Sequence, residues 1–158
     1  MLCSGLLLSL HNPFMMGRIM SIDYGLRRSG VAVSDPLQIV AGGLDTVETR
    51  LLIDFIVKYT AAEDVERIVV GLPVQNDGTP SENAARVRSF VGALKKKVTI
   101  PVEFYDERFT SVLAHKAMLA SGLHKMARRD KALVDKISAT IILQSYMESR
   151  RRLPVEKQ

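Results

Sequence analysis

The sequence has little of the chemistry on which disulfide-stabilised and soft-metal proteins depend: one cysteine and three histidines among 158 residues. Cys3 alone can form neither an intramolecular disulfide nor a cysteine metal cluster, which favours a reducing, cytoplasmic environment. His11, His115 and His124 lack the spacing of zinc ligands. Any bound metal is therefore expected to have oxygen ligands.

Long apolar runs are also missing. The run at residues 6–10 follows no positively charged segment and is far too short to cross a bilayer, so we expect no membrane partner. Several methionines lie just before the first convincing strand pattern. We interpret residues 1–16 as an appendage from an over-extended start site, 17–152 as one domain and 153–158 as a C-terminal tail.

Basic residues outnumber acidic ones by 22 to 17, which gives a formal net charge of +5. This balance favours a polyanionic partner such as nucleic acid, although many basic domains bind none. An apolar share of 47% is ordinary for a soluble globular protein, and the length suits one domain with a sizeable core.

The pattern of apolar residues predicts an alternation of strands and helices. Runs rich in β-branched residues predict strands at 19–24, 30–34, 67–72 and 100–105, and a short one from 39–41 and 44–47 around two glycines. Helical spacing predicts helices at 48–60, after a capping Ser81, at 111–120 and at 130–151. An antiparallel hairpin followed by crossovers indicates an α/β three-layer domain with a mixed five-stranded sheet.

Acidic residues stand where such a fold places ligands. Asp23 ends the first strand, Glu107 follows the last strand with Asp106 beside it, and Asp135 lies near the start of the last helix. Carboxylates at strand and helix ends can hold the divalent ions that activate water and stabilise charge on a phosphate. Each acid alone also has an ordinary structural explanation, so only the set of three points to metal-assisted phosphate chemistry.

Basic residues accompany these acids. Gly25 allows a tight turn after Asp23, and Arg27 and Arg28 follow it. The basic residues near the acids are Arg27, Arg28, Arg108, Lys125, Arg128, Arg129 and Lys131. They fit either solvated surface charge or binding of a phosphate backbone, with 125–131 as a cationic flap.

Four motifs, in order and at compatible spacing, resemble those of the YqgF/RuvX family of bacterial Holliday-junction-resolvase-like proteins, which are regarded as pre-16S rRNA nucleases. The motifs lie at 16–36, at 69–73 with 77–79, at 106–111 and at 134–139, so the resemblance covers nearly the whole chain from about residue 16 to 150. It implies a ribonuclease H-like fold and a cytoplasmic nuclease that trims the 5′ end of precursor 16S rRNA in ribosome biogenesis.

The leading hypothesis is a metal-dependent hydrolase of structured RNA, a monomer or homodimer that uses Mg²⁺ or Mn²⁺. The resemblance implies that Asp23, Glu107 and Asp135 are its catalytic, metal-binding acids. The expected substrate-binding residues are Arg27, Arg108, Thr110, Lys125, Arg128 and Arg129.

Three other functions remain open at this point. A Holliday junction resolvase acting on DNA would require a dimer with two facing sites. A non-catalytic RNA-binding assembly factor would need only the basic face, but clustered carboxylates repel RNA. An actin-like ATPase also has an Asp-x-Gly phosphate loop, yet that architecture needs two such domains, which 158 residues cannot supply.

Overall fold

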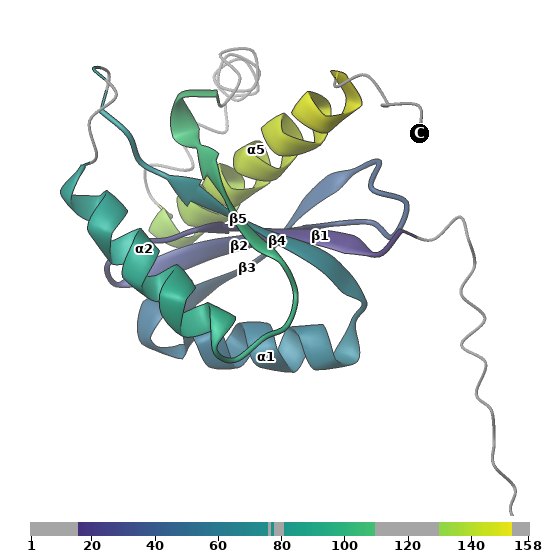
Figure 1. The fold of residues 1–158 in the computed structure, drawn as a ribbon, viewed down its shortest axis with the longest axis horizontal. Coiled ribbons are helices and arrows are strands. Elements are labelled where there is room, and N and C mark those ends of the chain that lie inside the picture. The colour runs from purple at the N-terminus through teal and green to yellow at the C-terminus, as the bar shows by residue number, and fades with distance from the viewer. Residues whose placement is uncertain (1–15, 76, 78–80, 110–129, 153–158) are drawn as a thin grey trace, which may run out of the picture.

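The computed structural model describes residues 16–75, 77, 81–109 and 130–152, and Figure 1 shows a central sheet with helices on both sides. The strands are β1 (Arg18–Asp23), β2 (Arg28–Ser34), β3 (Ala41–Glu48), β4 (Val65–Leu72) and β5 (Val102–Asp106). The α-helices are α1 (Leu52–Ala62), α2 (Glu82–Lys95) and α5 (Lys131–Arg152), and short 3₁₀ turns are η1 (Thr49–Leu51) and η2 (Glu107–Phe109).

The sheet has the strand order β3-β2-β1-β4-β5. β1 pairs antiparallel with β2 and β2 with β3, whereas β1 pairs parallel with β4 and β4 with β5. The predicted mixed five-stranded sheet is therefore confirmed. Because β1, β4 and β5 are parallel, their carboxyl ends share one edge, where Asp23 and Asp106 end their strands.

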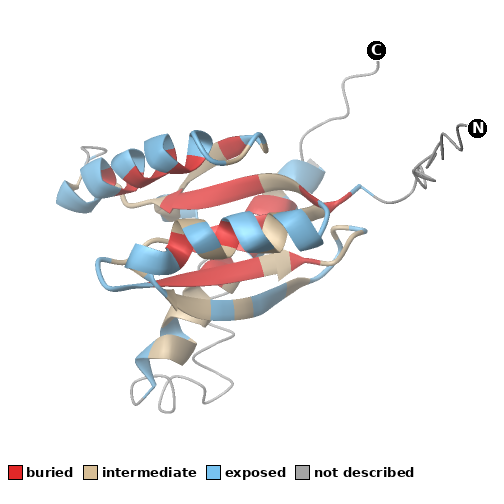
Figure 2. Ribbon diagram, turned by 90° about the horizontal axis from the view of Figure 1, so that it is seen from below, coloured by how far each residue is buried: buried red, intermediate tan, exposed pale blue. Residues whose placement is uncertain are grey.

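Two apolar clusters make the domain three-layered. One face of the sheet packs against α1 and α2, and the other against α5 (Figure 1). In Figure 2 the central strands are largely buried, whereas the outer faces of the helices are exposed, and no residue of the edge strand β3 is buried. Side chains alternate along β1, so that Met20 and Ile22 lie on the α1/α2 face and Ile19 lies on the α5 face. Both faces of the central strands are therefore apolar, as in parallel sheets covered on both sides.

Most predicted elements are confirmed within one or two residues. The predicted cap of α2 is present, since the Ser81 hydroxyl accepts a hydrogen bond from the Ala84 amide at 3.2 Å. One face of α2 carries a buried apolar stripe, and its members are Ala84, Val87, Val91 and Leu94. The predicted helix 111–120 and most of the predicted cationic flap at 125–131 lie outside the described residues.

Two boundaries differ from prediction. Ile39 and Val40 were expected in the third strand, but both are exposed, and their amides donate to the Asp35 carboxylate at 2.7 and 2.8 Å, which turns the chain before β3. The helix expected from residue 48 begins at Leu52 instead, because β3 continues to Glu48 and the Thr49 amide donates to the Arg27 carbonyl at 2.9 Å. None of the described helices is long and apolar enough to cross a membrane.

Candidate active site

Asp23 faces α5 because of the alternation of side chains along β1. Two residues earlier on the same face, the buried Ser21 hydroxyl donates a hydrogen bond to the Ala139 carbonyl of α5 at 2.6 Å. Two residues of a strand advance about 6.6 Å and one four-residue step of a helix about 6 Å. The Ser21–Ala139 contact therefore brings Asp23 to the level of Asp135, one turn nearer the start of α5.

Gly30 allows α5 to approach the sheet at this level. It is paired with Asp23 across β1 and β2. A Cβ atom built on Gly30 would collide with the backbone carbonyl of Asp135, so any other residue would push the start of α5 away from the sheet. Asp135 thus lies over the strand next to Asp23.

Gly71 has the same role on the other side of Asp23. The β1–β4 register pairs Ile22 with Val70, which places Gly71 one position further along, beside Asp23. A Cβ on Gly71 would lie 2.9 Å from Glu107 Oε1 and 2.7 Å from the Ile142 side chain. The central acid is therefore flanked by two glycines, and each makes room for one of the other two acids.

The electrostatics agree with this grouping. Burial raises the pKa of Asp23, and the negative charges of Glu107 and Asp135 raise it further, to about 7. Burial and the nearby Asp106 also raise the pKa of Glu107. Burial raises the pKa of Asp135 as well, although Arg28 opposes that rise. The three acids thus form one electrostatic group in which an added cation would be favoured.

Two arginines bind acids at the edges of this group. Arg28 Nε lies 3.3 Å from Asp135 Oδ2, and Arg108 binds Asp106 through Nε and Nη2 at 2.7–3.1 Å. These hydrogen bonds lower the pKa of Asp106, so Asp106 stays ionised and paired with Arg108. Arg28 was predicted near the acids, and its pairing with Asp135 confirms that placement.

The donor set suits a hard divalent cation, which prefers carboxylate oxygens. Within the described ranges, no three His, Cys, Asp or Glu side chains form a ready-made metal site. Holding an ion would require the Asp23, Glu107 and Asp135 side chains to draw together.

A closed ring of hydrogen bonds fixes the turn after Asp23. The Gly25 amide donates to Ser29 Oγ at 3.2 Å, the Ser29 and Thr49 hydroxyls lie 2.9 Å apart, and Thr49 Oγ1 donates to the Gly25 carbonyl at 2.7 Å. Because the Thr49 proton goes to Gly25, Ser29 must be the donor to Thr49. The ring ties the β1–β2 turn to the end of β3, and it holds the backbone next to the acids.

The expected substrate-binding residues divide into two groups. Arg27 is exposed in the β1–β2 turn, and Arg108 is exposed in η2, paired with Asp106. The others lie outside the described residues, namely Thr110, Lys125, Arg128 and Arg129.

The sequence prediction omitted Arg50, which lies near Arg27 and Arg28. The register Arg28–Glu48 explains why, since only the sheet brings the end of β3 beside the start of β2.

Comparisons with known proteins give a consistent picture. A model of the RuvX family, described as Holliday junction resolvase, matches residues 17–149. A Phocaeicola vulgatus protein named "Putative pre-16S rRNA nuclease" is 61% identical over 137 residues, 86% of this chain and 99% of that protein. A Bacteroides fragilis protein of the same name is 58% identical over the same shares.

A solved structure shows the fold. The Thermus thermophilus RuvC structure covers 84% of this chain and 96% of its own, with a TM-score of 0.50 and 13% sequence identity. The mixed five-stranded sheet with helices on both faces is ribonuclease H-like, as the sequence resemblance implied.

Substitution of the glycine under α5 should separate the helix from the sheet. We expect Gly30→Ala to lower the free energy of unfolding by more than about 2 kcal/mol, because the new Cβ meets backbone rather than a flexible side chain. The control is Gly92→Ala in α2, where a Cβ meets nothing within 4 Å and should stabilise the helix by up to about 1 kcal/mol. Urea unfolding of both variants measures the difference; equal effects would contradict the close approach.

The raised pKa of Asp23 predicts a pH dependence of stability. Between the unfolded pKa near 4 and the folded pKa of about 7, the folded chain holds a proton that the unfolded chain has lost, so this group lowers stability as pH rises. The full effect is at most about 4 kcal/mol. In metal-free buffer, Asp23→Asn should therefore be more stable than the parent at about pH 8 and similar to it near pH 4. A stability difference that does not change with pH would contradict the assignment.

Proposed function

The chain belongs to the RuvX family, and we propose that it is a nuclease, a metal-dependent hydrolase that cuts RNA phosphodiester bonds during 5′-end processing of precursor 16S rRNA. The names of its relatives support the substrate. The observation that carries the chemistry is the grouping of Asp23, Glu107 and Asp135, in which each of the outer acids raises the pKa of the central one.

In this proposal Asp23, Glu107 and Asp135 would hold one or two Mg²⁺ or Mn²⁺ ions. When bound, such ions activate a water molecule and stabilise negative charge on the phosphate. Asp23 has to be ionised to serve as a ligand, and a cation beside it lowers its pKa toward the ordinary range. If Asp135 bound such an ion, Arg28 would be available to pair with the approaching phosphate and would keep a positive charge at the site.

Basic residues around the acids bind the RNA backbone. Arg27 and Arg108 are exposed at the same end of the sheet as Asp23 and Asp106. We propose that they contact phosphates beside the scissile bond, together with residues of the following segment, which are Thr110, Lys125, Arg128 and Arg129. All three acids come from a single chain, so the proposed chemistry does not require a second copy, and a cytoplasmic monomer or homodimer would serve equally.

A second candidate is resolution of four-way DNA junctions. The description of the matching family favours it. Resolution needs two paired incisions and therefore two sites facing one junction, whereas trimming an RNA end needs one site. Incubation of the purified protein with precursor 16S rRNA and with a four-way DNA junction, under the same metal and salt conditions, distinguishes the two activities.

Loss of the central carboxylate should abolish cleavage. We expect Asp23→Asn to lower the rate of precursor rRNA cleavage by at least about a thousandfold, because the amide is neutral and a weak ligand, while RNA binding in metal-free buffer is retained. The control Asp54→Asn removes an exposed acid of α1 and should cut at the parental rate. Equal cleavage by Asp23→Asn and the parent would refute the site, and binding without turnover in the parent would favour an RNA-binding assembly factor.

Metal binding should be visible without any substrate. At a Mn²⁺ concentration tenfold above its dissociation constant, binding to the folded chain alone adds about 1.4 kcal/mol of stability, or roughly 3–5 °C in Tm. The shift should grow between about pH 6 and pH 8, because protons compete with the ion at Asp23 below its pKa of about 7. Thermal unfolding of the parent and Asp23→Asn with and without Mn²⁺ measures this. A shift of the same size in the variant would place the ion elsewhere.

A further inference from the structure

A cavity of about 790 Å³ adjoins the acids on the side of β2 and β3. Its lining residues come from the β1–β2 turn, the start of β2, the end of β3, η1 and the first two turns of α5, and they are Gly25, Leu26, Arg27, Arg28, Glu48, Arg50, Lys131 and Asp135. Its size lies in the range of ligand pockets. Because Asp135 lines the cavity and also contributes to the charge around Asp23, the cavity opens next to the proposed site of cleavage.

Positive charge dominates the lining. Four cationic side chains face two acidic ones, and the cations are Arg27, Arg28, Arg50 and Lys131. They come from separate stretches of sequence that the sheet and α5 bring together. Such convergence around a cavity suits an anion with several oxygens, since guanidinium groups bind phosphate through paired hydrogen bonds.

The ion pair between Arg50 and Glu48 in the lining is weak enough to be exchanged. Arg50 binds Glu48 at 2.7 Å, but their side chains are 76% and 58% exposed. Exposed pairs of this kind contribute little to stability. A phosphate can therefore recruit Arg50 at little cost.

The backbone behind the cavity is held in place. Gly25 belongs both to the lining and to the hydrogen-bond ring with Ser29 and Thr49, so the turn that carries Arg27 is fixed to the end of β3. Leu26 adds an apolar side chain that is 67% exposed, which can contact a sugar or base. Cations, a fixed backbone and one apolar contact are the elements of a nucleotide-binding surface.

We infer that this cavity is a binding subsite for the RNA backbone next to the scissile phosphate, and that Arg50 and Lys131 are phosphate ligands in it. The inference rests on the proposed function for the identity of the nucleic acid. It adds η1 and the start of α5 to the binding surface. The bound RNA strand would then run from the three acids toward the end of β3. Arg28 would lie between the acids and the cavity.

The test measures RNA binding without cleavage. A fluorescent single-stranded RNA of about 12 nucleotides is titrated with the full chain in EDTA at several salt concentrations. We expect Arg50→Gln and Lys131→Gln each to weaken binding roughly three- to tenfold at moderate salt, and to reduce the slope of log K against log salt by about 0.7. Both side chains are exposed, and thermal unfolding checks that the variants remain folded.

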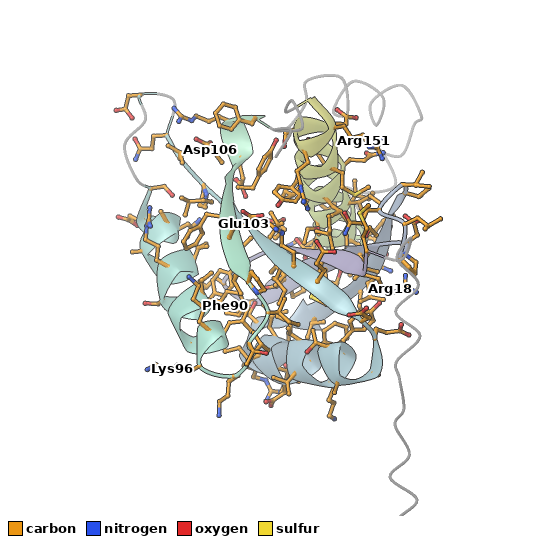
Figure 3. All side chains as sticks on the ribbon, turned by 45° about the vertical axis from the view of Figure 1, so that its right-hand side comes forward. Arg18, Phe90, Lys96, Glu103, Asp106 and Arg151 are labelled. Carbon is orange, nitrogen blue, oxygen red and sulfur yellow. The ribbon has the colours of Figure 1, made fainter. Side chains whose placement is uncertain are left out.

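The matched control is Lys96→Gln, which removes the same charge. Lys96 is exposed after α2, at the end of the molecule opposite Asp106 (Figure 3). It should change neither the affinity nor the slope. Equal weakening by Lys96→Gln would show attraction by net charge alone and would overturn the subsite. Parental binding by both Arg50→Gln and Lys131→Gln would overturn it too.

A chemical variant of the RNA tests what the cavity recognises. Replacing the phosphodiester linkages by uncharged methylphosphonates should make the parent and Arg50→Gln bind equally weakly, because the group that Arg50 contacts has lost its charge. A persistent difference between them would mean that Arg50 reads something other than phosphate, and would overturn the assignment. If the parent fails to cut precursor rRNA while these effects on RNA binding appear, the proposed function fails and the subsite stands. If the parent cuts precursor rRNA but Arg50→Gln and Lys131→Gln bind RNA as the parent does, the proposed function stands and the subsite fails.

Discussion

Repulsion among three carboxylates at one end of the sheet is the constraint on which the site and its surroundings depend. Asp23 is half-buried at the end of β1, and the charges of Glu107 and Asp135 disfavour its ionised form. The fold tolerates this arrangement because the apolar layers on both faces of the sheet stabilise the domain independently of the acids. This repulsion makes the site a strong candidate for cation binding, because a bound cation would reduce it.

The surrounding residues make this arrangement sterically and electrostatically feasible. Because Gly30 and Gly71 have no side chains, Asp135 and Glu107 can lie beside the central acid Asp23. The positive charge of Arg28 offsets the negative charge of Asp135, and that of Arg108 offsets Asp106. The acids and the basic cavity therefore share residues rather than lying side by side as separate units, and the pairing of Arg28 with Asp135 connects them.

Much of this organisation could be predicted from the sequence, because it is local. Alternating apolar residues indicated the strands, and the spacing after Ser81 indicated α2 and its cap. The start of α1 was predicted wrongly because it depends on a hydrogen bond between Thr49 and Arg27, far apart in sequence. The neighbourhood of Arg50 and the pairing of Arg28 with Asp135, 107 residues apart, likewise follow only from the sheet register and the docking of α5.

The contact between Ser21 and Ala139 has a consequence for how this chain can change. It holds only while strand and helix advance in step, two residues of β1 for four of α5. Replacing side chains between Asp135 and Ala139 leaves that step intact, whereas inserting one residue there would turn Asp135 by about 100° around the helix axis, away from Asp23. In this short stretch of α5, the number of residues therefore constrains the active site more tightly than their identity.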